Sequence, residues 1–219
     1  MSLKLYYAPG ACSFVPHVLL ELSGAPFEPV LVKLHKGEQR TPEYLAINPR
    51  GQVPVLADGG ENINQIVAIV CYLDAKFPQH GFLPRDGLAR AKGMELLCWM
   101  NNTVHPTFTH VFRPSTFAGE EAAQADVKAF NARRYAGLLG ELDAIVAGAA
   151  AKGQAWLTGD KPGAVDAYAL TLCRWSGFAG LDPTTFTALW AHVQKLAAHP
   201  AAARVIEREK LQLNLYKAS

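Results

Sequence analysis

The sequence lacks an excess of charge of either sign. Lysine and arginine number 21 and aspartate and glutamate 19 among 219 residues, which gives a formal net charge of +2. Domains that bind nucleic acid or acidic membranes usually carry a marked excess of basic residues on one surface. The charge balance therefore points to neither nucleic acid nor a membrane as a partner.

Long hydrophobic runs are also missing. The longest apolar stretch, residues 66–73, is far shorter than the about 20 residues that an α-helix needs to cross a bilayer. The N-terminus shows no apolar segment followed by a cleavage site, as a secretory signal would. We therefore expect a cytoplasmic protein.

Cysteine and histidine are scarce, and neither follows a metal-binding or disulfide pattern. The seven histidines form no His-x-x-x-His or Cys/His cluster, so we expect no bound metal. The cysteines show no pair spacing typical of a disulfide scaffold, which agrees with a reducing compartment. These four cysteines are Cys12, Cys71, Cys98 and Cys173.

Half of the residues are hydrophobic, enough for a sizeable core, and the first eighty alternate between strand and helix patterns. The turn Asp58-Gly59-Gly60 is a hairpin signal between two short strand candidates. Together these patterns predict a mixed four-stranded sheet with helices, of the thioredoxin type. The expected elements are strands at 3–7, 27–34, 53–57 and 61–64, and helical segments from Cys12, at 42–47 and from Gln65.

The remainder of the chain reads as helical. Proline and glycine punctuate residues 78–87 as a short linker. Beyond it, apolar residues recur at helical spacing, as in Val165, Tyr168 and Leu172, and no strand alternation competes. Pro106 should kink or end a long helix that starts near Leu88. The sequence thus predicts an α/β domain over residues 1–80 and an all-α helical bundle over 88–219.

Cys12 is the first candidate for chemistry because it stands where a strand turns into a helix. The turn Ala8–Ala11 precedes it, and Gly24 is placed to end the helix that follows. Unpaired N–H groups at a helix N-terminus favour the thiolate and can lower a cysteine pKa. The alternative is that Cys12 only fills a small space in the core.

Four motifs carry a resemblance to a known family. In order, they are residues 6–13 with the opening Tyr-Tyr-x-Pro-Gly-x-Cys-Ser, residues 45–56, residues 67–73 and Asp166-Ala167-Tyr168. The chain resembles glutathione S-transferases, most closely the bacterial beta class. The resemblance implies a transferase active in detoxification, with glutathione as co-substrate, a glutathione-binding thioredoxin-like domain, an acceptor-substrate site on the helical domain, and a homodimer.

Pro54 has two interpretations. From the residues alone, a proline in the run Val53-Pro54-Val55 reads as a trans proline at the start of an edge strand. The resemblance implies instead a cis bond whose turn presents the backbone of Val53 to the cysteinyl part of glutathione. Gln52, in the same motif, is then also expected to bind glutathione.

Further binding residues also come from the resemblance. Gln65 and Ile66 open a helix whose N-terminus receives the γ-glutamyl carboxylate, and Lys36 contacts the glycyl carboxylate. The family usually has an acid followed by serine or glycine where this chain has Gln65 and Ile66. It also has serine or threonine where this chain has Gly163, at the helix start that Asp166 should cap.

The chemistry at Cys12 has two forms. A second cysteine three residues on would let Cys12 resolve its own mixed disulfide, but Val15 stands there, so an external thiol is needed. Either the glutathione thiolate, assisted by Cys12 or Ser13, attacks a hydrophobic electrophile, or Cys12 is the nucleophile in glutathione-dependent disulfide or peroxide reduction. A non-catalytic ligand-binding or interaction protein of the same fold is the alternative function.

Two further expectations concern the helical domain. His105 resembles a histidine that faces the ligand, and so is included with Cys12 and Ser13 as catalytic; its alternative is a histidine that ends a helix before Pro106. The acceptor substrate itself cannot be identified from the sequence. It would lie against one or more of Phe14, Phe108, Phe112, Phe117 and Trp175.

Overall fold

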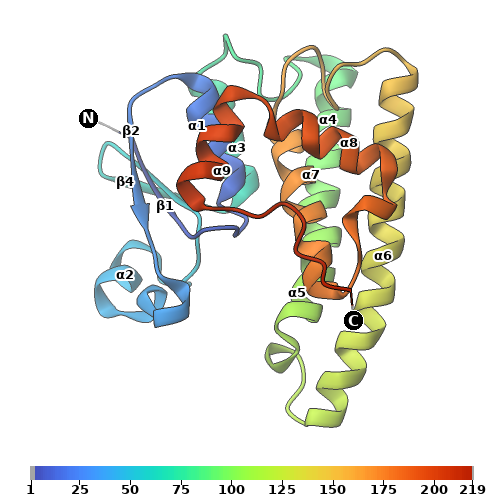
Figure 1. The fold of residues 1–219 in the computed structure, drawn as a ribbon. Helices are drawn as coiled ribbons and strands as arrows, with labels where there is room; N and C mark the ends of the chain where they lie inside the picture. The colour runs from blue at the N-terminus through green and yellow to red at the C-terminus, as the bar shows by residue number, and fades with distance from the viewer. Residues whose placement is uncertain (1–2, 219) are drawn as a thin grey trace.

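The structure, a computed structural model, describes residues 3–218 as a sheet-containing half beside a taller bundle of helices (Figure 1). The sheet has four strands in the order β2-β1-β3-β4, with β1 parallel to β2 and antiparallel to β3. β4 pairs antiparallel with β3. The mixed four-stranded sheet is therefore confirmed. The strands are β1 (Leu3–Tyr7), β2 (Phe27–Leu31), β3 (Val55–Asp58) and β4 (Glu61–Asn64).

Alternation along β1 divides the apolar side chains of the sheet between its two faces. Leu3, Leu5 and Tyr7 belong to the main core, which they share with α1 (Phe14–Ser23) and α3 (Ile66–Lys76). Tyr6 points the other way and contacts Tyr44 of α2 (Pro42–Ile47) edge to face, with ring centroids 6.0 Å apart. The period of two in strand side chains thus places one helix layer on each face.

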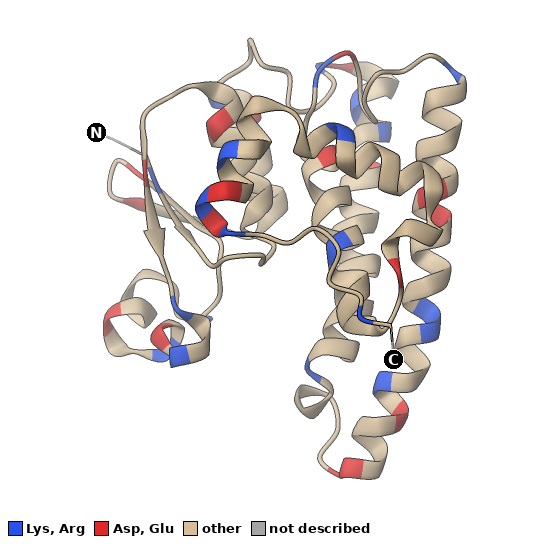
Figure 2. Cartoon of the chain, viewed as in Figure 1, with Lys and Arg blue, Asp and Glu red and all other residues tan. Residues whose placement is uncertain are grey.

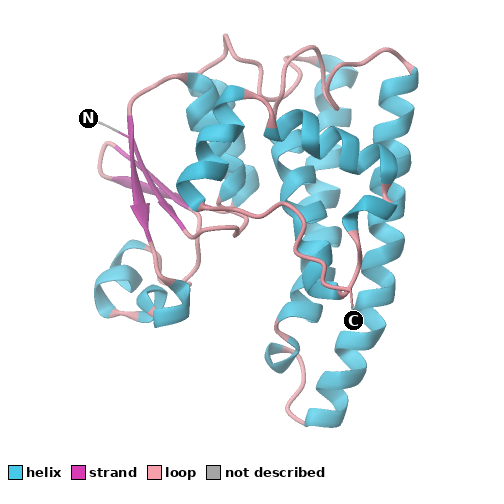
Figure 3. Ribbon diagram, in the orientation of Figure 1, coloured by secondary structure: helices cyan, strands magenta, loops and turns pink. Residues whose placement is uncertain are grey.

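The remaining helices form the bundle, which is coloured by secondary structure in Figure 3. α7 lies at its centre, and nearly all of its side chains are buried. Unlike the other helices of this half, α9 leaves the bundle and packs against α1 of the sheet half (Figure 1). One continuous hydrophobic core therefore spans both halves. The helices are α4 (Gly87–Trp99), α5 (His105–Phe112), α6 (Glu121–Ala151), α7 (Ala164–Trp175), α8 (Thr187–Ala197) and α9 (Pro200–Glu209).

Several element boundaries differ from the predicted ones. α1 begins at Phe14 and not at Cys12, since Cys12 and Ser13 form a turn before the helix. β2 ends at Leu31, where the chain turns into two short 3-10 segments, Leu34–Lys36 and Glu38–Arg40. β3 begins at residue 55, directly after a cis proline, and α3 begins at residue 66.

The interruption expected at Pro106 is present and lies just before it. A π-helical turn, Met100–Val104, separates α4 from α5. A proline inside a helix lacks the N–H donor, and its ring collides with the carbonyl four residues earlier. The wider π turn accommodates both effects, so the chain stays helical on either side of the proline.

Asp166 caps α7 as expected, and the structure explains the glycine that stands where the family has a hydroxyl. One carboxylate oxygen of Asp166 accepts from the Gly163 N–H at 2.8 Å, and the other accepts from the Leu157 N–H at 3.0 Å. A Cβ added to Gly163 would lie 2.5 Å from the carbonyl oxygen of Phe82. Close packing of two backbone segments thus disfavours serine and threonine at this position, because one segment would have to shift.

Charged residues of both signs are distributed over the two halves (Figure 2). No helix within residues 3–218 combines the length and the apolar character needed to cross a membrane. In the same range, no three histidine, cysteine, aspartate or glutamate side chains gather closely enough to hold a metal ion.

Candidate functional site

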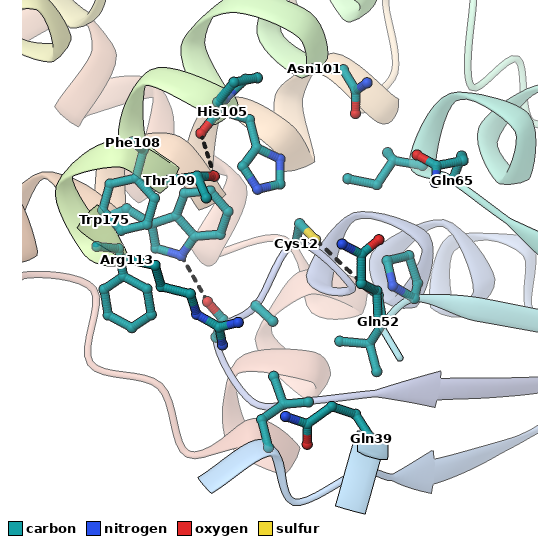
Figure 4. A pocket seen from close by; sticks show the side chains of 18 of the residues that line it. Cys12, Gln39, Gln52, Gln65, Asn101, His105, Phe108, Thr109, Arg113 and Trp175 are labelled. Carbon is teal, nitrogen blue, oxygen red and sulfur yellow. Dashed lines mark hydrogen bonds between the residues drawn. The ribbon is translucent and has the colours of Figure 1, made fainter. Parts of the chain in front are cut away.

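A cavity of about 540 Å³ lies between the sheet half and helices α5 and α7, and Cys12 stands at its middle (Figure 4). Polar residues such as Gln52 and Gln65 line it on the sheet side. Aromatic residues such as Phe108 and Trp175 line it on the helical side. The cavity therefore has a polar region on the sheet side and an aromatic region on the helical side, and the sulfur of Cys12 lies between them.

Ser13 shapes the turn that carries Cys12 but does not reach the cavity. Its hydroxyl accepts from the Ala8 N–H at 3.1 Å and donates to the Ala8 carbonyl at 3.2 Å, and the residue is fully buried. The structure thus does not bring Ser13 to the site as a catalytic group. Its hydroxyl closes the loop over residues 8–13 and so fixes the direction of the neighbouring cysteine.

The helical half holds the same turn at Gly10. The Gly10 N–H donates to Glu209 Oε2 at 2.8 Å, and the Gly10 carbonyl accepts from Trp175 Nε1 at 2.8 Å. Gly10 has φ of +68°, a conformation that favours glycine. The N–H and the carbonyl of Gly10 are therefore both anchored by residues more than 160 positions further along the chain.

The surroundings of the Cys12 thiol act to raise its pKa, whereas the position near a helix N-terminus favoured a lowered pKa. Its Sγ donates to the Val53 carbonyl at 3.7 Å. Burial raises the pKa of Cys12 to about 12, and the N–H groups of Cys12 and Ser13 oppose that effect only in part. The prediction failed because it weighed the helix N-terminus and not the loss of water around the sulfur.

The Val53–Pro54 peptide bond is cis, as the resemblance implied. The loop before it is held by Tyr44, whose hydroxyl donates to the Gln52 carbonyl at 2.8 Å, and by Asn48, whose side-chain amide donates to the same oxygen at 2.7 Å. Gln52, Val53 and Pro54 all line the cavity. The predicted contact region for the cysteinyl part of glutathione is therefore assembled beside Cys12.

Gln65 and Ile66 also line the cavity, at the start of α3. Gln65 has φ of +73°, which is unusual for a residue other than glycine. Such strained positions cluster where a fold presents groups to a ligand. The first N–H groups of α3 have no partner within their helix, so they are available to a carboxylate.

Two polar residues that sequence reasoning missed lie on the same side. The side-chain oxygens Oδ1 of Asn64 and Oε1 of Gln39 are buried and accept no hydrogen bond from any described residue. Buried acceptors are normally paired, so both are suited to N–H groups of a ligand. Lys36, in contrast, is exposed and does not line the cavity; Gln39, three residues on, does. No motif in the sequence marks Gln39.

His105 faces the cavity as the first residue of α5, so the alternative that it ends a helix is wrong. Its Nδ1 shares a hydrogen bond of 2.7 Å with the Tyr168 hydroxyl, and its ring lies 4.8 Å from the Trp175 ring. Burial lowers the pKa of His105 to about 4. The imidazole is therefore neutral at pH 7 and can act as a hydrogen-bond partner but not as a cation.

Aromatic rings line the helical side of the cavity. Phe108 and Trp175 stack with centroids 4.6 Å apart, and Phe112 lies 5.3 Å from Phe178. Phe117 lines the cavity as well. Phe14 does not, because its side chain is buried in the main core. Of the five aromatic candidates, four are thus brought together, and Phe178 joins them without any sequence signal.

Known proteins are similar to this chain over nearly its full length. Residues 1–75 match the family described as the N-terminal domain of glutathione S-transferase. Glutathione S-transferase GST-4.5 of Xanthomonas campestris is 32% identical over 212 residues, covering 95% of this chain and 100% of that protein. Glutathione S-transferase GstA of Escherichia coli O157:H7 is 32% identical over 213 residues, covering 96% of this chain and 100% of that protein.

Solved structures of glutathione transferases share the fold of this chain. A glutathione transferase homologue from Sulfitobacter with bound glutathione superposes with a TM-score of 0.87 at 26% identity, covering 96% of this chain and 99% of that one. A beta-class glutathione S-transferase from Sphingomonas chungbukensis gives 0.79 at 28% identity, covering 95% and 100%. The chain belongs to the glutathione S-transferase family and is a glutathione transferase.

Proposed function

We propose that this glutathione transferase joins the sulfur of glutathione to small hydrophobic electrophiles, and that the neutral Cys12 thiol donates a hydrogen bond to that sulfur. The observation that carries the proposal is the position and protonation of Cys12. Its Sγ lies at the junction of the polar and aromatic regions, and its pKa of about 12 keeps the proton on the thiol. A neutral donor stabilises an anionic sulfur without becoming a competing nucleophile.

The polar region supports glutathione as the occupant of the sheet side. The cis turn offers the backbone of Val53, the start of α3 offers free N–H groups, and Gln39 and Asn64 offer buried acceptors. These groups complement a tripeptide that carries carboxylates, amides and an amine. The cysteinyl sulfur of glutathione would then point towards Cys12 and the aromatic rings beyond it.

Two variants of Cys12 test the proposal. Cys12→Ser keeps a hydrogen-bond donor of similar size, whereas Cys12→Ala removes it. With a generic aryl chloride, Cys12→Ser should retain most of kcat/KM, while Cys12→Ala should lose about tenfold, the effect of one hydrogen bond to a charged group. If both variants are equally inactive, the sulfur of Cys12 is itself the nucleophile, and the proposal is wrong.

Glutathione-dependent disulfide or peroxide reduction through Cys12 is the second candidate, favoured by the location of its sulfur inside the cavity. In that reaction Cys12 would form a mixed disulfide that a glutathione thiol then resolves. The folded protein should be exposed to oxidised glutathione and its peptides mapped by mass spectrometry. A predominant adduct on Cys12, together with loss of disulfide reduction in Cys12→Ala, would support this activity; an unmodified Cys12 would exclude it.

We also propose a homodimer that detoxifies electrophiles in the cytoplasm. The resemblance to the beta class supports the dimer, and the four free cysteines support a reducing compartment. Sedimentation at micromolar concentration should give twice the mass of the 23.7 kDa chain. A monomer alone under these conditions would remove the dimer from the proposal.

A further inference from the structure

We propose that the electrophile carries a carboxylate, which Arg174 and Arg113 bind while its conjugated ring lies against Trp175 and Phe108. This inference rests on the proposed function and adds the charge and shape of the second substrate. It comes from the helical side of the cavity, which the sequence could describe only as a set of aromatic residues.

The cavity wall is unbalanced in charge. The described residues that line the cavity include two arginines, Arg113 and Arg174. They include no aspartate or glutamate. Neither arginine forms an ion pair within 4.0 Å with any residue in the described range. Arg174 is half-buried, and the nearby Glu209 carboxylate is already held by His17 and the Gly10 N–H, so an anionic ligand is a suitable direct partner for its guanidinium.

Arg174 packs against Gly10, in the turn that leads to Cys12. Its Nη1 donates to the Gly10 carbonyl at 3.4 Å and its Nε to the Gln212 carbonyl at 2.7 Å, so both partners are uncharged. The guanidinium packs so tightly on the turn that a Cβ at Gly10 would lie 2.5 Å from Nη1. Because Gly10 is two residues before Cys12, a carboxylate on this guanidinium holds its ring beside the site of attack.

Arg113 adds a second positive charge at the mouth of the cavity. It follows α5 directly, and its guanidinium carbon lies 5.9 Å from the centre of the Phe112 ring. Its side chain is exposed, and no side-chain hydrogen bond to a described residue fixes it. In Figure 4 it lies with Phe108 and Trp175, across Cys12 from Gln52 and Gln65.

The rings between the two arginines define the shape of the ligand. Phe108 and Trp175 stack with an interplanar angle of 19°, and Phe112 stacks on Phe108 at the same angle. Phe108 and Trp175 are each only 5% exposed, whereas Phe112 is 52% exposed, so Phe112 offers most of the ring surface on which a planar conjugated ligand gains offset stacking. Planarity and negative charge together describe a conjugated or aryl carboxylate.

The carboxylates of glutathione are an unsuitable partner for these arginines. The start of α3 and the buried acceptors of Asn64 and Gln39 face the tripeptide from the sheet side. Arg113 and Arg174 belong to the helical half, and Figure 4 shows Arg113 on the far side of Cys12 from Gln65. If a glutathione carboxylate did bind these arginines, Arg174→Gln would weaken glutathione itself.

A pair of matched substrates isolates the carboxylate. Chloronitrobenzoate and chloronitrobenzamide share ring, nitro group and leaving group, and differ only in the charge of one substituent. In each reaction the glutathione thiol loses its proton to solvent, the thiolate forms the C–S bond, and chloride leaves with the electron pair of the C–Cl bond. The ratio of kcat/KM for the anion to that for the amide, followed across variants, cancels the intrinsic reactivity of the ring.

The variants are Arg174→Gln and Arg113→Gln, with Arg133→Gln on the exposed surface of α6 as the control. Arg174→Gln should lower the anion-to-amide ratio about tenfold or more, as expected for loss of a charge-assisted hydrogen bond. Arg113→Gln, which has no packing role that could disturb folding, should lower it less. Arg133→Gln should leave it unchanged. An unchanged ratio in both cavity variants overturns the inference.

Binding of the two product conjugates gives a readout that needs no turnover. Calorimetry should show that the carboxylated glutathione conjugate binds the native protein more tightly than its carboxamide twin, and that Arg174→Gln removes the difference. Equal binding of the two by the native protein contradicts the inference alone. Failure of both to bind contradicts the proposed function as well. If Arg174→Gln weakens glutathione itself as much as the carboxylated conjugate, the arginine serves glutathione and the inference is wrong.

Discussion

At the scale of single residues, the site keeps two titratable groups uncharged beside the place where a thiolate must form. Burial raises the pKa of Cys12 to about 12 and lowers the pKa of His105 to about 4. Both therefore act as neutral hydrogen-bonding groups throughout the physiological range. The negative charge that develops in the reaction is then carried by the sulfur of glutathione and not by the protein.

The lowered pKa of His105 makes the protein sensitive to acid. The unfolded chain takes up a proton near pH 6.5, whereas the folded protein resists it until about pH 4. Stability linked to this residue is therefore complete above pH 6.5 and is lost as the pH falls towards 4. Urea unfolding at the two ends of this range should show a smaller loss for His105→Gln than for the native protein. An equal loss would assign the acid sensitivity to other groups.

Gln65 provides a second test at this scale. Its side chain lines the cavity where the family usually has an acid. Gln65→Ala should weaken glutathione by about 1 kcal/mol, the value of a neutral hydrogen bond, and Gln65→Glu should tighten it because a charged bond to the ligand amine is stronger. Calorimetry measures both, with Gln154, which lies outside this cavity, changed to alanine as a control. No change in either Gln65 variant would place the γ-glutamyl end elsewhere.

At the scale of elements, the starts of the helices determine what the site presents. Ser13 closes the turn before α1, Gln65 stands in a left-handed conformation before α3, and Asp166 caps α7. Each fixes the backbone just outside a helix, where unpaired N–H groups remain. The positions of Cys12, Ile66 and Tyr168 follow from these three caps.

Gly163 gives a prediction in which capping and packing oppose each other. Gly163→Ser restores the hydroxyl that usually caps such a helix, but because glycine is itself an acceptable N-cap the gain is only about a few tenths of a kcal/mol. Its Cβ, however, would meet the Phe82 carbonyl at 2.5 Å, and such overpacking costs about 1–3 kcal/mol. Thermal unfolding should therefore show a net loss of stability.

The control is Gly148→Ala in α6, where no atom lies within 4 Å of the added Cβ. That change should stabilise the protein by up to about 1 kcal/mol, because alanine is the better helix former. A stabilised Gly163→Ser would mean that the Phe82 segment moves away easily and that packing does not select glycine there.

The sequence predicted the elements well and their boundaries less well. Periodicity and turn residues were enough for the four strands, for α1 and for the helical half, since these depend on local pattern. The cis bond at Pro54 came only from the resemblance, because a single proline does not reveal its isomer. The charge states of Cys12 and His105 depend on how much water the folded cavity excludes, and Arg174 and Phe178 reach it only through tertiary packing. None of these has a local signal.

At the scale of the whole molecule, the C-terminal helix α9 connects the bundle back to the turn over residues 8–13 that carries Cys12. Glu209 is buried, with one oxygen 2.7 Å from His17 Nδ1 and the other accepting from the Gly10 N–H. Arg208, beside it, donates to Glu21 of α1 at 2.7 Å. The two halves of the chain thus share one polar network directly beneath Cys12.

Removal of Glu209 should affect stability and catalysis together. Glu209→Ala leaves the buried His17 ring and the Gly10 N–H without their acceptor, a loss of about 3 kcal/mol or more. Because the Gly10 turn also carries Cys12, kcat/KM for conjugation should fall as well. Glu207→Ala, on the exposed side of the same helix, should change neither. Full activity of folded Glu209→Ala would show that the network stabilises the fold without positioning the turn.

The central claim, that Cys12 stays protonated and lowers the pKa of the glutathione thiol, is tested most directly by titrating the thiolate by its ultraviolet absorbance. In the native protein, a thiolate should form below the ordinary thiol pKa of about 8.5 only when glutathione is bound. Its pKa should persist in Cys12→Ser and return towards 8.5 in Cys12→Ala, where no donor is left. A thiolate that titrates near neutral pH in the ligand-free protein and disappears in Cys12→Ser would contradict the account.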